Sequence, residues 1–144
     1  MEHHVIDELN SFLEGNFMAI HAYENYIEHI DDANLKAHLQ ELQEDHKQHA
    51  EMIAKRIQTL GGVPVDDVGL KGTIAEFVVH LKGVTKENSS ILKDALVGEK
   101  RGIKKSKQIL SGDLDHESLE LVKDILNEDE KHIDLLSEMI DNRE

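Results

Sequence analysis

Four residues in two matched pairs have the types and the spacing of metal ligands. His46 and His49 lie three residues apart in the first half of the chain, and Asp129 and His132 lie three residues apart in the second half. On a helix, residues at this spacing are neighbours on one face, so each pair can serve one centre. Imidazole and carboxylate ligands together suit iron, manganese or zinc.

The two pairs belong to a longer internal repeat. Adding 83 to the residue number takes His46 to Asp129, His49 to His132 and Asn16 to Glu99. The same shift takes apolar residues onto apolar residues, as in Leu9 and Leu92, Leu13 and Leu96, Ile20 and Ile103, Leu42 and Ile125, and Ile53 and Leu136. A self-match at a fixed spacing indicates a duplicated architecture. Two such halves that face each other would gather these polar side chains in one interior, as in four-helix bundles that bind metals.

The composition indicates one all-α domain over residues 1–144. Hydrophobic residues make up 39% of the chain, aromatic residues 3% and charged residues 32%, which is typical of a helical bundle. The absence of cysteine excludes thiolate metal sites and disulfides, and it fits the cytoplasm.

The formal net charge of −14 predicts a surface that repels nucleic acid and anionic membranes and attracts cations. The plain alternative is a solvated acidic exterior without a specific role. Because the chain shows no signal peptide and no long apolar run, we expect a cytoplasmic protein that does not partner a membrane.

Apolar residues recur at three- and four-residue steps and predict four long helices. Their expected ranges are 5–30, 33–60, 87–110 and 116–140. Asp31 or Asp32 is expected to cap the second helix, and Asp113 or Asp115 the fourth. The run from Gly61 to Pro64 is a strong stop signal.

Residues 61 to about 87 would form a crossover, and Ile74, Phe77, Val78 and Leu81 indicate a short helix within it. Short loops join the other neighbouring helices. Two helical hairpins joined by one long crossover form the ferritin-like variant of the antiparallel four-helix bundle.

Five polar residues within the apolar stripes are the candidate metal ligands. Burying a charged group is costly, and metal coordination is one remedy. For each residue there is a plainer interpretation: a hydrogen-bonded core histidine, a carboxylate paired with Lys or His, or, for His46, an exposed position. Asn16 is interpreted as a buried hydrogen-bonding group. The candidate ligands are His46, His49, Glu99, Asp129 and His132.

Three stretches carry a resemblance to a known group of proteins. They are Leu9–Asn16, His49–Pro64 and Glu130–Leu136, and they resemble the ferritin-like superfamily, bacterioferritin in particular. The crossover from Gly69 to Gly83 and the Gly98-Glu99 region are similar to a small family of ferritin-like bundles known only as a domain of unknown function. The resemblance covers nearly the whole chain.

The resemblance implies a metal centre with an unusual ligand set. Glu99, His49 and His132 match the ligands of family members that have an oxidase centre. Asp129 is a shorter carboxylate than the usual Glu, while His46 stands in place of a bridging Glu and Asn16 in place of a terminal Glu. Two carboxylates replace the usual four, so a single metal or an asymmetric pair is expected rather than a conventional di-iron centre.

The resemblance also implies roles for other positions. Tyr23 falls where the family has a tyrosine close to the metals, although packing is its plainer role. Asp45 and Glu128, four residues before His49 and His132, are placed to restore missing charge. Lys47 stands where bacterioferritin carries its haem-binding methionine, so no haem is expected.

These features predict a ferritin-like metal-binding protein. Iron is the expected metal, with Mn or Zn as alternatives, and a ferroxidase-type enzyme would oxidise Fe(II) with oxygen or peroxide. The alternatives are a single-metal binding protein without turnover and a structural bundle with a degenerate site. Since the sequence stops at Glu144, shortly after the fourth helix, a small homo-oligomer is expected.

Overall fold

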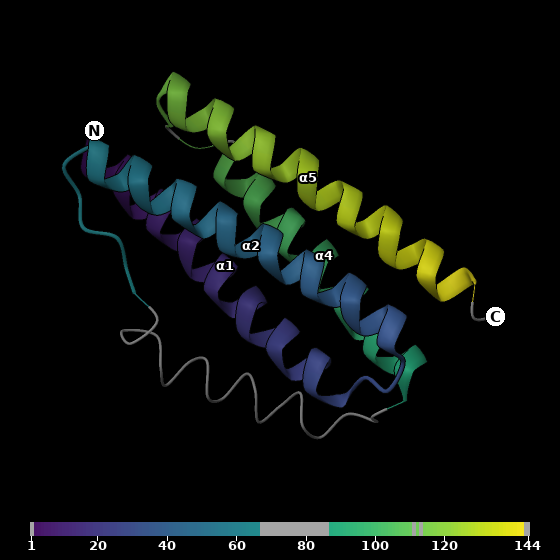
Figure 1. The fold of residues 1–144 in the computed structure, drawn as a ribbon. Coiled ribbons are helices and arrows are strands. Elements are labelled where there is room, and N and C mark those ends of the chain that lie inside the picture. Colours follow the sequence, from purple (N-terminus) through teal and green to yellow (C-terminus); the bar gives the residue numbers. More distant parts are fainter. Residues whose placement is uncertain (1, 67–86, 111, 113, 143–144) are drawn as a thin grey trace.

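Four long helices make up the computed structural model, which describes residues 2–66, 87–110, 112 and 114–142. Their bounds lie within three residues of the predicted ones at every end, and the helices lie side by side (Figure 1). They are α1 (Glu2–His29), α2 (Ala33–Thr59), α4 (Asn88–Leu110) and α5 (His116–Asp141).

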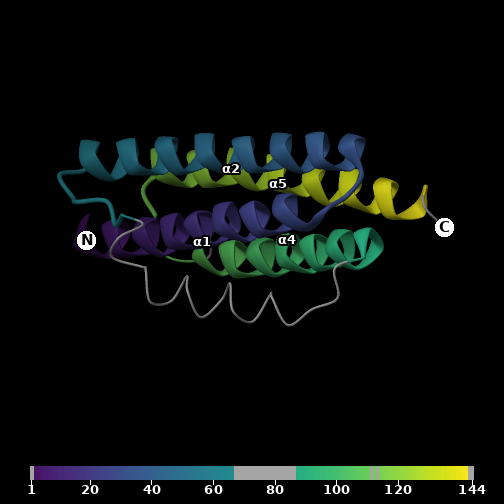
Figure 2. The same ribbon diagram turned by 60° about the horizontal axis from the view of Figure 1, so that its bottom comes forward.

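The helices form a two-layer antiparallel bundle. Figure 2 shows α2 and α5 in one layer and α1 and α4 in the other, with α1 packing against α2 and α4, and α5 against α4 and α2. The backbone N–H of Asp31 donates to Asn88 Oδ1 at 3.1 Å, which holds the start of α4 beside the α1–α2 turn. At the opposite end, Val65 donates to Asn10 Oδ1 at 2.9 Å. The connection between the two hairpins therefore joins opposite ends of the bundle, which confirms the ferritin-like topology.

The helix ends follow the predicted capping signals. Asp32 caps α2, because its side chain accepts hydrogen bonds from the backbone of Asn34 and Leu35 at 2.8 and 3.1 Å. Gly61 adopts a φ of 88°, and its N–H reaches Gln58 O at 3.0 Å. Together with the bond from the next residue's N–H to Ile57 O, this closes α2 as a Schellman motif.

A network around Arg56 ties the end of α2 to the start of α5. Asp115 is the N-cap of α5, and its carboxylate also accepts a hydrogen bond from Arg56 at 2.7 Å. The same guanidinium donates to Ser118 Oγ at 3.0 Å and to Glu117 at 2.8 Å. Burial raises and the bonds with Ser118 and Arg56 lower the pKa of Asp115, with a net decrease.

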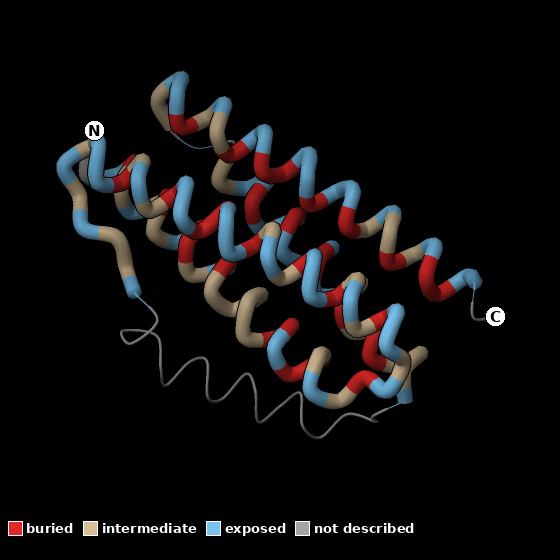
Figure 3. Tube along the Cα trace, in the orientation of Figure 1, coloured by how far each residue is buried: buried red, intermediate tan, exposed pale blue. Residues whose placement is uncertain are grey.

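The buried faces of the helices form two apolar clusters with a polar layer between them, and Figure 3 shows these faces turned inward. One cluster includes Tyr26, Leu39, Leu92 and Leu136. The other includes Leu9, Leu13, Ile53, Ile103 and Ile125. Each of the four helices has buried polar residues between its two apolar groups in the sequence, so a polar layer crosses the middle of the bundle. They are Asn16, His46, His49, Glu99, Asp129 and His132.

The short helix expected around Ile74 and Leu81 lies outside the described residues. Within the described ranges, none of the helices combines the length and the apolar character that crossing a membrane requires.

Candidate metal centre

Each of the four helices contributes to the polar layer. Asn16 comes from α1, His46 and His49 from α2, Glu99 from α4, and Asp129 and His132 from α5. All six residues are buried, with exposed fractions between 4% and 8%. The exposed alternative for His46 is therefore wrong. Four of the five predicted ligand residues, His46, Glu99, Asp129 and His132, form one group, and His49 adjoins it through Asp129.

Glu99 is the anion that links two of the imidazoles. His46 Nε2 lies 2.6 Å from Glu99 Oε1, and His132 Nδ1 lies 2.7 Å from Glu99 Oε2. Burial alone would raise the pKa of Glu99, but the bonds from His132 and His46 outweigh it and lower the pKa to about 2. The carboxylate is therefore ionised at neutral pH.

Asp129 lies among three imidazoles without a hydrogen bond to its inner oxygen. Its Oδ1 is 3.6 Å from His49 Nδ1, 3.6 Å from His132 Nδ1 and 4.0 Å from His46 Nδ1. This buried atom has no hydrogen-bond partner within the part of the chain that the structure describes. Burial raises the pKa of Asp129 to about 7. Such an orphaned carboxylate calls for a further cation or a proton.

His49 and His132 differ in how their ring nitrogens are satisfied. His132 bonds at both nitrogens, to Glu99 and, through Nε2, to Asp45 Oδ2 at 2.9 Å. Burial lowers its pKa, but these carboxylates dominate and raise it to about 9. His49 Nε2 lies 3.4 Å from Glu128 Oε2, while its buried Nδ1 lacks a hydrogen-bond partner among the described residues. Burial and the charge of His46 lower the pKa of His49.

The outer contacts repeat the 83-residue symmetry. The His132–Asp45 pair and the His49–Glu128 pair exchange under that shift, because Glu128 corresponds to Asp45. Both carboxylates contact Nε2, the nitrogen remote from Asp129, and their side chains are 41% and 55% exposed. The sequence marked Asp45 and Glu128 as sources of charge, but it did not reveal that each pairs with the histidine of the opposite hairpin. Carboxylates at this position fix the ring orientation of metal-binding histidines.

Asn16 and Tyr23 occupy the α1 side of the layer. Asn16 Nδ2 donates to Phe12 O at 3.0 Å, and its Oδ1 lies 3.4 Å from His46 Nδ1, in line with a buried hydrogen-bonding residue. The Tyr23 ring packs with its centroid 5.6 Å from that of His46. Burial, and then the nearby charge of Glu99, raise the pKa of Tyr23, yet its hydroxyl makes no well-formed hydrogen bond within the described residues.

The donor set fits a metal ion. One ligand atom from each of His46, Glu99, Asp129 and His132 lies within 4.8 Å of the other three. A self-contained polar network, the plainer alternative, satisfies Glu99 and His132 but leaves Asp129 Oδ1 and His49 Nδ1 without partners among the described residues. Since both orphaned atoms are potential ligands that face each other at 3.6 Å, a cation would satisfy both.

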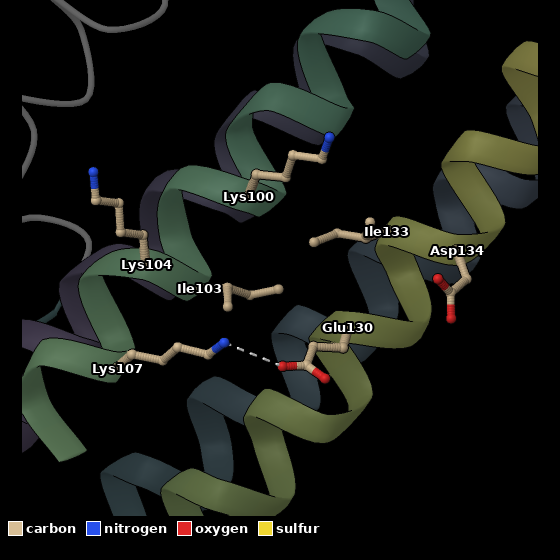
Figure 4. Close-up of a pocket in the computed structure, with 7 residues that line it drawn as sticks. All are labelled: Lys100, Ile103, Lys104, Lys107, Glu130, Ile133 and Asp134. Atoms are coloured by element: carbon tan, nitrogen blue, oxygen red, sulfur yellow. Dashed lines mark ion pairs between the residues drawn. The ribbon is translucent and has the colours of Figure 1, made fainter.

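Two hollows border α4. One lies between α4 and α5, and the other lies between α4 and α1. Figure 4 shows the first, between α4 and α5, where the Lys107 and Glu130 side chains form an ion pair at 3.7 Å across exposed surface. None of the candidate ligands lines it. The second lies between α1 and α4 and is lined in part by His46, Glu99 and Asp129.

Comparison with known proteins supports the fold at the level of family and architecture. Residues 4–112 match the family described as a domain of unknown function (DUF2383). No curated protein matches the sequence significantly.

Three solved structures resemble the bundle. A dodecameric thioferritin, the bacterioferritin-related protein from Bacteroides fragilis, is 23% identical with a TM-score of 0.81, over 99% of this chain and 87% of that one. A ferritin-like diiron-carboxylate protein from Bacillus anthracis is 19% identical with a TM-score of 0.68, over 96% of each chain. A two-domain protein from Anabaena variabilis, with DJ-1/ThiJ/PfpI-like and ferritin-like domains, is 21% identical with a TM-score of 0.82, over 100% of this chain but 41% of that one. At these identities the likeness establishes the ferritin-like fold alone.

Proposed function

The chain belongs to the DUF2383 family, and we propose that it is a ferritin-like metal-binding protein whose ion lies in the polar layer of the bundle. The ligands in this proposal are His46, His49, Glu99, Asp129 and His132. The pair of orphaned buried atoms, Asp129 Oδ1 and His49 Nδ1, carries the proposal, because a metal is the partner that both can share.

The charge of the layer favours a single divalent ion or an asymmetric pair. Glu99 and Asp129 together supply two negative charges when both are ionised, which balance one divalent cation. Burying a second divalent ion would leave excess positive charge in a medium of low polarity. Mixed imidazole and carboxylate ligands suit iron and also manganese or zinc, and the relative described as a diiron-carboxylate protein favours iron.

The surrounding residues of the chain hold the ligands in place. Asp45 and Glu128 accept hydrogen bonds from the outer nitrogens of His132 and His49, so that the inner nitrogens of both rings face Asp129. Apolar clusters pack on both sides of the layer along the bundle axis. A transition metal bound here would supply a redox-active or Lewis-acidic centre.

Oxidation of Fe(II) is the enzymatic form of this proposal. Fe(II) would be the substrate, and each ion would lose one electron to oxygen or peroxide and leave as Fe(III). A binding protein that holds one ion without turnover is the second candidate, and the small negative charge of the ligand set favours it over a conventional di-iron oxidase.

Metal analysis of purified protein without a histidine tag tests the binding proposal. The protein is equilibrated with Fe(II) without oxygen, or with Mn(II) or Zn(II), and gel-filtered before elemental analysis. We expect close to one ion per chain in the wild type and none in His132→Ala. His38→Ala, a change at an outward-facing histidine of α2, serves as the matched control and should retain the ion. Equal metal content in wild type and His132→Ala would show that the ligand assignment is wrong.

Turnover is tested separately by adding several equivalents of Fe(II) in air and recording ferric absorbance. An enzyme would oxidise the iron faster than buffer does, and His132→Ala would remove the acceleration. Binding without faster oxidation would favour the second candidate.

Assembly is a further part of the proposal. We expect a homo-oligomer, since the relative from Bacteroides fragilis is dodecameric and since Met52 and Val97 are large apolar residues exposed by 45% and 51%. Light scattering coupled to size exclusion would report the mass, and a monomer at micromolar concentration would contradict this expectation.

A further inference from the structure

The hollow between α1 and α4 is a cavity of about 350 Å³ that leads from the surface to the polar layer. Its wall is mainly apolar and includes Phe12, Met18, Ala19, Ala95 and Ile103. Cavities of this size with apolar walls and few polar groups are typical of small-molecule sites.

Glycines keep the mouth of the cavity open. Gly15 on α1 and Gly98 on α4 are partners under the 83-residue shift, and both line the cavity. Both glycines are exposed, and a Cβ built on either one meets no atom of the described residues within 4 Å, so the space beside them is open there. Larger side chains at these positions can therefore be accommodated without a clash in the described structure.

The inner end of the cavity carries buried polar atoms without partners. Tyr23 is 2% exposed and lines the cavity, and its hydroxyl lies near Glu99 but makes no well-formed hydrogen bond among the described residues. The orphaned Oδ1 of Asp129 belongs to the same lining. Leaving such groups unpaired is costly, so a ligand that satisfies the tyrosine hydroxyl gains affinity there.

We propose that this cavity binds a small, mainly apolar organic molecule that carries one hydroxyl group. The apolar body lies against the α1 and α4 side chains, and the hydroxyl hydrogen-bonds with Tyr23 at the inner end. The molecule would then end beside His46, Glu99 and Asp129, next to the proposed metal. The site itself is built from side chains that need no metal, so it can be tested separately from the metal proposal.

Two soluble probes of similar shape test the site. p-Cresol has the proposed hydroxyl, and toluene lacks it. In an NMR titration of the metal-free protein, we expect saturable binding of p-cresol to one site per chain, with the largest shifts on the residues of α1 and α4 that line the cavity. Absence of saturable p-cresol binding, or largest shifts on residues outside the cavity lining, would overturn the proposal.

Filling the mouth should block the probes. The double variant Gly15→Leu and Gly98→Leu is expected to bind p-cresol at least about tenfold more weakly, because leucine side chains occupy the vacant space. Ala37→Leu adds the same side chain to an exposed position of α2 and should bind like the wild type. Equal affinity in the filled variant and the wild type would contradict the assigned location.

The role of the hydroxyl is tested by Tyr23→Phe. We expect p-cresol affinity to fall about five- to tenfold, while toluene affinity stays the same, since only p-cresol uses the hydrogen bond. A purely structural effect of the change would weaken both probes alike and would overturn the assigned orientation. Because these titrations use metal-free protein, they test the cavity independently of the metal site. A negative titration would contradict the cavity proposal alone, and a negative metal analysis would contradict the metal proposal alone.

Discussion

Asn16 is the residue that breaks the symmetry of the candidate site. In the second hairpin Glu99 accepts a hydrogen bond from His132 Nδ1, and in the first hairpin Asn16 occupies the matching place, while His49 Nδ1 stays unpartnered among the described residues. The amide supplies no negative charge, which limits the layer to two carboxylates. The identity of this one side chain thus bears on how many ions the site can hold.

The variant Asn16→Glu tests this reasoning. A third carboxylate should raise the metal content from about one ion per chain towards two, since it adds both a ligand and a charge. Without metal, the extra buried carboxylate should lower the melting temperature, because a buried charge without a partner is costly.

Asn16→Gln is the matched control, since it lengthens the side chain without adding charge. Elemental analysis and thermal unfolding of both variants provide the readout. An unchanged metal content in Asn16→Glu would contradict the proposed link between charge and occupancy.

Metal binding should release protons in a pH-dependent way. The pKa of His132 is raised to about 9 and that of Asp129 to about 7, so without metal His132 is protonated at neutral pH and Asp129 is partly so. A metal displaces these protons, so we expect roughly one to two protons released per ion at pH 7. Affinity should rise as the pH increases through 7 towards 9 and then level off.

Calorimetric titrations in buffers of different ionisation enthalpy count these protons directly. At any pH where the His132→Gln variant still binds metal, its binding should release about one proton fewer than binding by the wild type. Binding that releases no protons between pH 6 and pH 8 would contradict the proposed ligands.

The sequence predicted which residues meet but not how they pair. The helical spacing and the 83-residue shift placed five candidate ligands on facing stripes. Four of them form one group in the structure, and His49 lies beside Asp129 at its edge. The ring orientations depend on contacts between hairpins, such as His132 with Asp45, which no local pattern encodes. The cavity was also not predicted, because it depends on the separation of α1 and α4 rather than on either sequence stripe.

At the level of the helices, local signals determined most of the boundaries. Asp32, Asp115 and Gly61 act where capping chemistry places them, because each satisfies backbone groups that the helix itself leaves unpaired. Of the two candidate caps of the fourth helix, Asp115 fills the role. The helix expected in the crossover lies outside the described residues and stays a prediction.

The cap of α5 gives a stability prediction with a defined pH dependence. Asp115→Ala removes both the cap and the partner of Arg56 and should cost about 1 kcal/mol of unfolding free energy at pH 7. Asp115→Asn keeps a capping oxygen and loses only the partly buried ion pair with Arg56, so it should cost less.

The sign of the pH effect follows from the lowered pKa of Asp115. A carboxylate with a lower pKa in the folded protein stabilises it above the unfolded pKa, and this contribution is lost as the pH falls. The difference between wild type and Asp115→Asn should therefore shrink when urea unfolding is repeated near pH 3. If the difference in unfolding free energy between wild type and Asp115→Asn grows at low pH, the ionised carboxylate of Asp115 does not stabilise the folded protein.

For the molecule as a whole, the polar layer divides the core into two apolar clusters. The metal-free layer contains buried polar atoms without partners among the described residues, so it stabilises the fold less than an apolar layer of the same volume would. A metal that binds only the folded protein would reverse this cost.

Metal removal should therefore lower the melting temperature. At an ion concentration about one hundred times the dissociation constant, binding adds about 2.7 kcal/mol, or roughly 5–10 °C for a chain of this size. Chelation should return the protein to the metal-free value, and His132→Ala should show no metal-dependent shift in thermal unfolding. A wild-type protein whose unfolding ignores both metal and chelator would contradict an interior site.

An anomalous-difference map from crystals grown with Mn(II), Fe(II) or Zn(II) tests the central claim most directly. We predict a peak in the middle of the bundle, within coordination distance of Asp129 and His132 and of ligand atoms from α2 and α4. A map with peaks only at surface carboxylates, together with an ordered layer satisfied by its own side chains and water, would contradict it.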